Sequence, residues 1–124
     1  MVNEISERKI SLELPFSDAN KNHVRTIYAM SISMLMEVAG TSLIRATYGF
    51  DNFMVIIKKM NVNYLKPANE NVFCNLEIDV ETAKKLIEPI EERKRGNFPL
   101  NISVKNKDDE EIANGEFVFY LFKI

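Results

Sequence analysis

The sequence predicts an α+β protein in which one long helix is covered by an antiparallel sheet. Within the stretch 22–45, residues 27–44 hold apolar or small side chains on nearly every side of the helical wheel, and a helix of this kind is expected to be covered all round. The segments around it alternate apolar and polar residues with the period of two that is typical of strands. The short connections between these segments favour antiparallel pairing.

Before the helix, the sequence predicts one strand and one loop. Residues 9–14 alternate until Pro15, which ends the strand because it has no amide hydrogen to donate. Residues 16–25 are rich in Asn, Asp, Ser and Lys and are expected to form a polar loop. The helix should begin near Thr26 and end around 47–49, where a glycine precedes turn-forming residues.

Beyond the helix, four further strands and a short peripheral helix are expected. The strands are predicted at residues 53–65, 72–81, 100–104 and 112–122. In the first half of 53–65 and in most of 112–122, apolar residues occupy both parities, so both faces of these strands are expected to be covered. The short helix is predicted at 82–95 with Thr82 as its cap, and 105–111 is expected to form a charged turn between two strands.

The composition is that of an ordinary globular protein with one domain, residues 1–124. With 46% hydrophobic and 27% charged residues, the 124-residue chain is long enough for a single hydrophobic core. The net charge of −2 offers no basic surface, which argues against nucleic acid as a partner. Cys74 is the only cysteine, so no internal disulfide can form and a cytoplasmic location is expected. His23 is the only histidine, which excludes a multi-histidine metal site.

The composition also argues against a signal peptide and a membrane span. Residues 1–20 carry charged side chains and no long apolar run, so no signal peptide is expected there. Residues 27–44 approach the minimum length for crossing a bilayer. They would place the carboxylate of Glu37 at membrane depth, however, where a charge is costly. We therefore expect no contact with a membrane.

Glu37 is the strongest functional clue in the sequence. It lies in the middle of the apolar run, with no basic residue at helical spacing on either side. A structural explanation would be a carboxyl group bonded to Ser33 or Thr41 one turn away, or an ion pair with a basic residue from elsewhere in the chain. The functional explanation is a carboxylate that works as a base or nucleophile.

The dimensions of the expected sheet predict an oligomer. Five strands about 4.8 Å apart form a sheet more than about 20 Å wide, whereas a helix about 10 Å across covers only part of one face. A second copy of the chain related by a two-fold axis would cover the remaining apolar side chains. We therefore expect at least a homodimer, and a homotetramer stays open.

Four features of the sequence resemble the hotdog-fold acyl-CoA thioesterases, and most closely their phenylacetate-type branch. They are Asn22 in a polar loop, the segment 26–29 at the helix start, Glu37 fifteen positions after Asn22, and the segment 63–68. The resemblance implies a hotdog fold, in which a five-stranded antiparallel sheet wraps a long central helix. It also implies dimers joined edge to edge, an acyl-CoA or acyl-carrier thioester as substrate, and no cofactor.

The resemblance also assigns roles to individual residues. Glu37 matches the acidic residue that acts as general base or nucleophile, and Asn22 matches a loop asparagine that orients the carbonyl or the water. The developing oxyanion would lie against backbone amides at the helix start, between Ala29 and Ser31. Substrate would also contact His23, and Asn22 and Glu37 would act across the dimer interface.

The helix start differs from that of the catalytically established relatives. They carry a histidine and two glycines where this chain has Tyr28, Ala29 and Met30. Glycine allows the backbone to approach a ligand closely. A methionine side chain at position 30 is expected to narrow or fill the space for an oxyanion. The alternative function is therefore binding of acyl groups by a dimer that has a regulatory role or no catalytic activity. A hydratase or dehydratase activity is the third hypothesis.

Six methionines are present, of which Met30, Met34 and Met36 lie in the helix and Met54 lies near the start of the next strand. Their flexible side chains suit an adaptable acyl pocket. Ordinary packing in the hydrophobic core is the expectation.

Overall fold

The computed structural model describes residues 2–17, 21–22 and 26–124 and confirms the α+β class. It contains six strands and two helices over these ranges. In chain order they are β1 (Val2–Ser6), β2 (Lys9–Leu14), α1 (Ala29–Tyr48), β3 (Phe53–Tyr64), β4 (Val72–Glu77), α2 (Val80–Arg93), β5 (Arg95–Asn106) and β6 (Glu111–Lys123).

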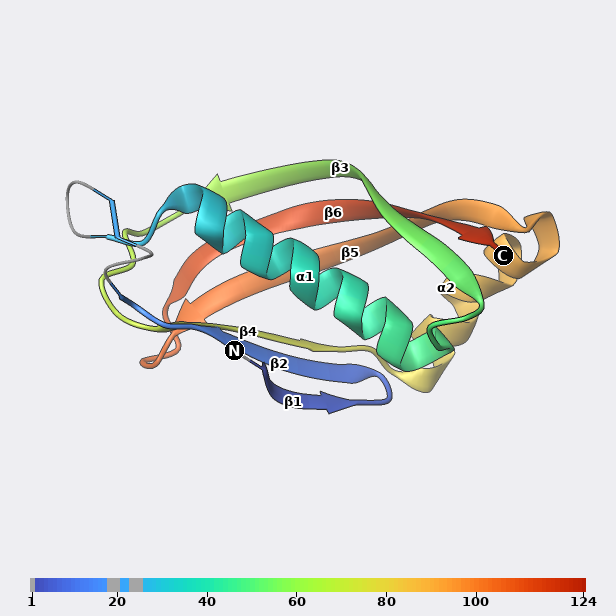
Figure 1. Cartoon of the computed structure of the whole chain (residues 1–124), viewed down its shortest axis with the longest axis horizontal. Coiled ribbons are helices and arrows are strands. Elements are labelled where there is room, and N and C mark those ends of the chain that lie inside the picture. The colour runs from blue at the N-terminus through green and yellow to red at the C-terminus, as the bar shows by residue number, and fades with distance from the viewer. Residues whose placement is uncertain (1, 18–20, 23–25) are drawn as a thin grey trace.

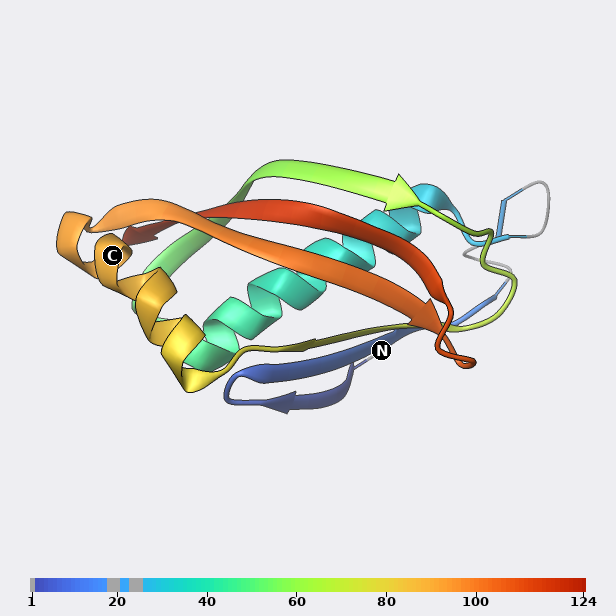
Figure 2. The same cartoon turned by 180° about the vertical axis from the view of Figure 1, so that it is seen from behind.

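The six strands form one antiparallel sheet in the order β1-β2-β4-β5-β6-β3. The sheet curves around α1, which runs diagonally across its concave side, while β5 and β6 pass behind the helix (Figures 1 and 2). β3 and β1 are the two edges of the sheet. The edge of β3 is therefore available for pairing with another strand.

The expected five strands become six because β1 pairs with β2. All five residues of Val2–Ser6 are exposed, so this strand has no buried face to give it the alternating pattern of a strand. It forms because the chain turns back at Arg8, whose φ of 65° is left-handed, and pairs with Lys9–Leu14. Backbone hydrogen bonds rather than apolar burial hold this edge.

The boundaries of the short helix also differ from the expectation. α2 begins at Val80 and not at 82, because Asp79 is the N-cap and its carboxylate accepts from the amide of Thr82 at 2.7 Å. That hydrogen bond lowers the pKa of Asp79. At the other end, Lys94 has a φ of 67°, and β5 follows at once. The strand expected at 100–104 is therefore 12 residues long.

The core lies between α1 and the concave face of the sheet. The helix contributes Ile32, Leu35, Met36, Ala39, Leu43 and Ile44, all nearly or fully buried. Gly40 marks the closest approach, because a Cβ atom there would lie 2.5 Å from Cζ of Phe119 on β6. Cys74 is fully buried on β4 and packs as a small hydrophobic residue, as predicted.

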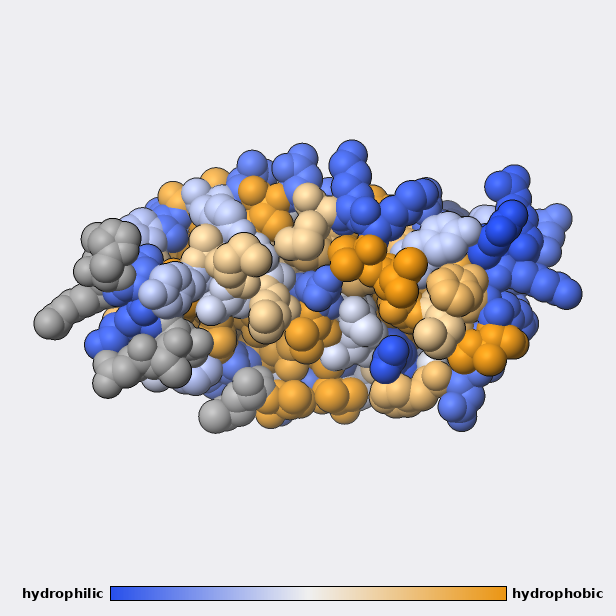
Figure 3. Space-filling model, turned by 45° about the horizontal axis from the view of Figure 1, so that its top comes forward, coloured by the Kyte–Doolittle hydropathy of each residue, from blue (hydrophilic) through white to orange (hydrophobic). Residues whose placement is uncertain are grey.

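A single chain leaves one side of α1 uncovered, so the expected cover on all sides requires a second copy. On the side of α1 that faces away from the sheet, Met30 is 74% exposed, Met34 63% and Val38 48%. Met54 and Ile56 on β3 are also exposed, so the first half of this strand is covered on one face only. Figure 3 shows apolar side chains gathered along α1 and β3. We call the outward side of α1 the open face, defined by Met30, Met34 and Val38. Met54 and Ile56 alternate with the core-facing Phe53, Val55 and Ile57 and therefore point from the other face of the sheet.

The methionines follow the same division. Of the four named above, only Met36 packs in the core, and Met30, Met34 and Met54 are exposed. Core packing is therefore the wrong explanation for three of them. β6, by contrast, lies inside the sheet between β5 and β3, as its apolar pattern predicted.

Replacing Gly40 with alanine tests the close contact between helix and sheet. At an exposed helical position this change raises stability by about 1 kcal/mol, because glycine is a poor helix former. At Gly40 we expect a loss of about 1–3 kcal/mol, since the new methyl group meets the ring of Phe119. Chemical denaturation of the wild type and of Gly40→Ala measures this difference in the free energy of unfolding. In a Phe119→Leu background the cost of Gly40→Ala should shrink, and a stabilising Gly40→Ala would contradict this packing.

Candidate functional site

A hollow of about 240 Å³ lies at the start of α1. Residues from three segments line it. They are Asn22, Thr26 and Ile27 before the helix, Ala29 and Ile32 in its first turns, and Tyr64, Leu65, Lys66, Pro67 and Ala68 at the end of β3 and just after it. The segments are joined because the amide of Ile27 donates to the carbonyl of Ala68 at 2.8 Å. The hollow thus brings together three of the four sequence features that point to a thioesterase.

Asn22 closes the loop that leads into the helix. Its Nδ2 donates to the hydroxyl of Thr26 at 2.8 Å, and its Oδ1 accepts from the amide of Thr26 at 3.0 Å. Its own amide donates to the carbonyl of Thr26 at 2.7 Å. Asn22 therefore both lines the hollow and fixes the loop that forms its wall. His23, the other loop residue predicted to contact substrate, lies outside the described residues.

The first turn of α1 offers free backbone amides. The helix begins at Ala29 and not near Thr26, and the carbonyl of Tyr28 accepts from the amides of Ser31 at 3.0 Å and Ile32 at 3.3 Å. Within the described ranges, the amides of Ala29 and Met30 have no hydrogen-bond acceptor. The first turn also carries no acidic side chain. An anion at this helix terminus would be stabilised by the amides and by the helix dipole.

The residues of the first turn point in different directions. Ala29 lines the hollow, whereas the side chains of Tyr28 and Met30 are 50% and 74% exposed and do not line it. The side chain of Ser31 borders a separate apolar groove between β2 and α1. Met30 therefore leaves the hollow open, because its side chain extends toward solvent.

Glu37 is half-buried on the same helix, eight residues after Ala29, a rise of about 12 Å. It does not line the hollow, so one chain does not bring Asn22 and Glu37 into a single cavity. Its carboxylate has no hydrogen-bond or ion-pair partner in the part of the chain that the structure describes. The hydroxyl of Ser33, one of the suggested structural partners, bonds instead to the hydroxyl of Tyr64.

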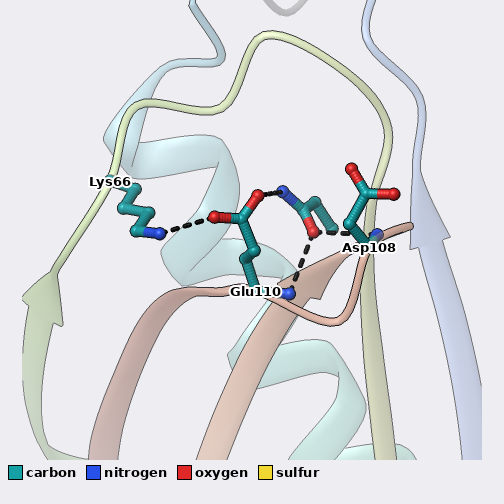
Figure 4. A network of polar contacts seen from close by, with 4 residues as sticks. Lys66, Asp108 and Glu110 are labelled. Atoms are coloured by element: carbon teal, nitrogen blue, oxygen red, sulfur yellow. Dashed lines mark hydrogen bonds and ion pairs between the residues drawn. The ribbon is translucent and has the colours of Figure 1, made fainter.

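Lys66 forms the rim of the hollow through a polar network (Figure 4). Its Nζ donates to Glu110 at 2.6 Å, and Asn106 donates to the other oxygen of the same carboxylate at 3.1 Å. The hydrogen bond from Lys66 and then that from Asn106 lower the pKa of Glu110. The network ties the segment after β3 to the turn between β5 and β6, which holds this wall of the hollow in place.

Two other titratable groups are perturbed by burial. Desolvation raises the pKa of the Cys74 thiol to about 12 and that of Tyr48 to about 12, and the Tyr48 hydroxyl donates to the carbonyl of Ala83 at 2.7 Å. A buried thiol of this kind is not a nucleophile at neutral pH. Over the described ranges, no group of three metal-binding side chains occurs, and neither helix has the length and hydrophobicity to span a membrane.

Comparison with protein families places the chain in one of them. The family model described as Domain of unknown function (DUF4442) matches residues 1–121. The chain belongs to the DUF4442 family. A comparison of this DUF4442 protein with curated protein sequences gives no match.

Solved structures show that the DUF4442 fold is of the hotdog type. PA5026 from Pseudomonas aeruginosa, a protein of unknown function described as a probable thioesterase, has a TM-score of 0.90 at 21% identity, over 99% of this chain and 82% of its own. SAV0944 from Staphylococcus aureus, described as a thioesterase enzyme, has a TM-score of 0.77 at 15% identity, over 98% and 92% of the two chains. A second substituted form of SAV0944 has a TM-score of 0.79 at 15% identity, covering 100% and 93%.

Thiol labelling tests the burial of Cys74. In the native protein at pH 8, we expect no reaction with an aromatic disulfide reagent on a timescale of minutes, because the thiol is buried and its pKa is about 12. In denaturant, one thiol per chain should react at once. Fast labelling of the native protein would contradict the packing of β4.

Proposed function

We propose that this DUF4442 protein hydrolyses acyl thioesters of coenzyme A or an acyl carrier, with Glu37 as general base or nucleophile. The observation that carries the proposal is the state of Glu37. It is a half-buried carboxylate without a partner in the described part of the chain, on the helix whose start presents free amides to a hollow. A structural carboxylate in such a position would be expected to have a partner.

The chemistry follows from these groups. Glu37 takes a proton from water, and the hydroxide attacks the thioester carbonyl carbon. The carbonyl oxygen becomes an oxyanion and accepts hydrogen bonds from the amides of Ala29 and Met30, where the helix dipole favours negative charge. Collapse of the tetrahedral intermediate breaks the carbon–sulfur bond, and the protonated Glu37 returns its proton to the leaving thiolate, so that the thiol and the carboxylic acid are released. Asn22, at the wall of the hollow, orients the carbonyl or the water.

The proposed site is shared by two subunits. The rise of about 12 Å between Ala29 and Glu37 is too long for one thioester carbonyl to touch both groups of the same helix. A two-fold dimer through the edge of β3 and the open face brings the helix start of one subunit to Glu37 of the other. The exposed apolar side chains of the open face support such an interface, since Met30, Met34 and Val38 lie four residues apart along one side of α1.

The similar structures support the proposal because one of them has an amide residue and a glutamate fifteen positions apart, at positions chosen for substitution. The two forms of SAV0944 carry alanine in place of a glutamine and in place of a glutamate, and these positions are fifteen residues apart in that chain. Asn22 and Glu37 have the same spacing here. We propose the phenylacetate-type branch for this chain, because Asn22 and Glu37 are among the features that carry the resemblance to it. Acyl-CoA and acyl-carrier substrates agree with the proposed cytoplasmic location.

A dimer that binds acyl groups without catalysis is the second candidate. It is favoured by the side chain of Asn22, whose oxygen and nitrogen are both bonded to Thr26. An asparagine bonded in this way has less capacity to hold a carbonyl or a water. Thermal stabilisation by acyl-CoA without release of thiol would favour this second function.

Glu37→Gln tests the proposed mechanism. With a panel of acyl-CoA substrates, we expect thiol release by the wild type and a loss of at least about 100-fold in kcat for the variant, because the amide cannot take a proton from water. Thermal unfolding should change little, since the carboxylate has no partner to lose in the described part of the chain. Glu92→Gln, an exposed change on α2, is the matched control. Full activity of Glu37→Gln would contradict the mechanism.

Size-exclusion chromatography with light scattering tests the proposed dimer. The wild type should elute as a dimer or larger assembly, and Met34→Lys should shift the population toward the monomer by placing a charge on the open face. Val80→Lys makes the same change at a similarly exposed apolar position on α2 and should have no effect. A strictly monomeric wild type would contradict the shared site.

A further inference from the structure

Tyr64 is held at the hollow by an unusual partner. Ser33 is the only buried polar residue in the described part of the chain, 3% exposed in the second turn of α1. Its hydroxyl is hydrogen-bonded to the hydroxyl of Tyr64, the last residue of β3. From the sequence, Ser33 was considered only as a partner of Glu37 and Tyr64 only as part of the segment 63–68, so neither was assigned this role.

The position of Ser33 places the Tyr64 hydroxyl near the free amides. Ala29, Ser33 and Glu37 are four residues apart, so they lie along one side of the helix. Helical side chains lean toward the N-terminus, and the Ser33 hydroxyl therefore lies over the first turn. Both Ala29 and Tyr64 line the hollow. The phenol is thus fixed in the wall of the same cavity that the amide of Ala29 borders.

The hydrogen-bonding capacity of the pair leaves one donor for a ligand. A hydroxyl has one hydrogen to donate and two lone pairs to accept with. When Ser33 donates to the tyrosine oxygen, the tyrosine hydrogen is free for an acceptor in the hollow. We propose that Tyr64 is a catalytic residue that donates this hydrogen bond to the thioester carbonyl oxygen, and that Ser33 is its positioning residue.

This inference rests on the proposed hydrolase function and adds a donor that the helix start alone does not provide. As hydroxide attacks the carbonyl carbon, the electron pair of the carbon–oxygen double bond moves to the oxygen. That oxygen then accepts from Tyr64 together with the amides of Ala29 and Met30. Tyr64 keeps its proton throughout, so its contribution is electrostatic stabilisation of the oxyanion. Side-chain donors of this kind serve alongside backbone amides in oxyanion sites.

The direct test is Tyr64→Phe, assayed with the best acyl-CoA of the panel. We expect kcat to fall by about 100-fold with little change in KM, because the lost bond strengthens only as charge develops. Ser33→Ala should lower kcat less, and Ser33→Thr, which keeps the hydroxyl, should retain most of the activity. Tyr120→Phe on β6 is the matched control, since Tyr120 does not line the hollow. A Tyr64→Phe enzyme with wild-type kcat would overturn the inference and leave the proposed hydrolase intact.

A double variant separates this role from a loss of folding. Tyr64→Phe alone leaves the buried Ser33 hydroxyl without its partner, which lowers stability. Ser33→Ala with Tyr64→Phe removes both polar groups and should recover thermal stability while kcat stays low. Recovery of kcat together with stability would show that Tyr64 is only structural and would overturn the inference.

Binding of the product acid decides the inference if the wild type releases no thiol. Titration calorimetry with octanoate should give binding to the wild type and at least tenfold weaker binding to Tyr64→Phe, because the phenol donates to a carboxylate oxygen in the same position. Equal binding to both proteins, or no binding to either, would overturn the inference. Absent turnover with this difference in binding would overturn the hydrolase and the catalytic role of Tyr64, and would leave Tyr64 as the donor to a bound acyl group.

Discussion

The structure depends on the packing of one face of α1 into the curved sheet. Gly40 allows the helix to approach β6 closely, because any larger side chain would meet Phe119. This contact fixes which side of the helix is buried. The opposite side, with Met30, Met34 and Val38, must then face outward, and Glu37 lies at its border. The functional proposal follows from that orientation, because a carboxylate buried in the core would have no access to water or substrate.

The elements of the fold with a buried face were predictable from the sequence, and those without one were not. β2, β3, β4 and β6 each have alternating or continuous apolar residues, so periodicity located them. β1 is exposed throughout and is held by backbone pairing, which leaves no mark in the pattern. The cap of α2 was misplaced by three residues because Asp79 competes with Thr82 for the same role.

The candidate site was predictable only in part, because its residues meet through the fold. Asn22, Ala29 and the segment after β3 were recognised separately, and the hydrogen bond between Ile27 and Ala68 joins them around one hollow. Their resemblance to known thioesterases pointed to Glu37, whereas Tyr64 was recognised only as part of the segment 63–68, with no role of its own. Its hydrogen bond to Ser33 joins residues 31 positions apart, which no local pattern reveals. The exposure of Met30 was equally hidden, because its position on the helix gives no direction until the buried face is known.

A subunit-complementation assay tests the shared site most directly. Glu37→Gln removes the carboxylate, and Ala29→Phe fills the hollow at the helix start. Each variant alone should be inactive. When the two are unfolded together and refolded at equal amounts, half of the dimers are mixed and each mixed dimer has one intact site, so about one quarter of the wild-type rate should return. A mixture with no more activity than its parents would contradict a site formed by Glu37 of one subunit and the helix start of the other.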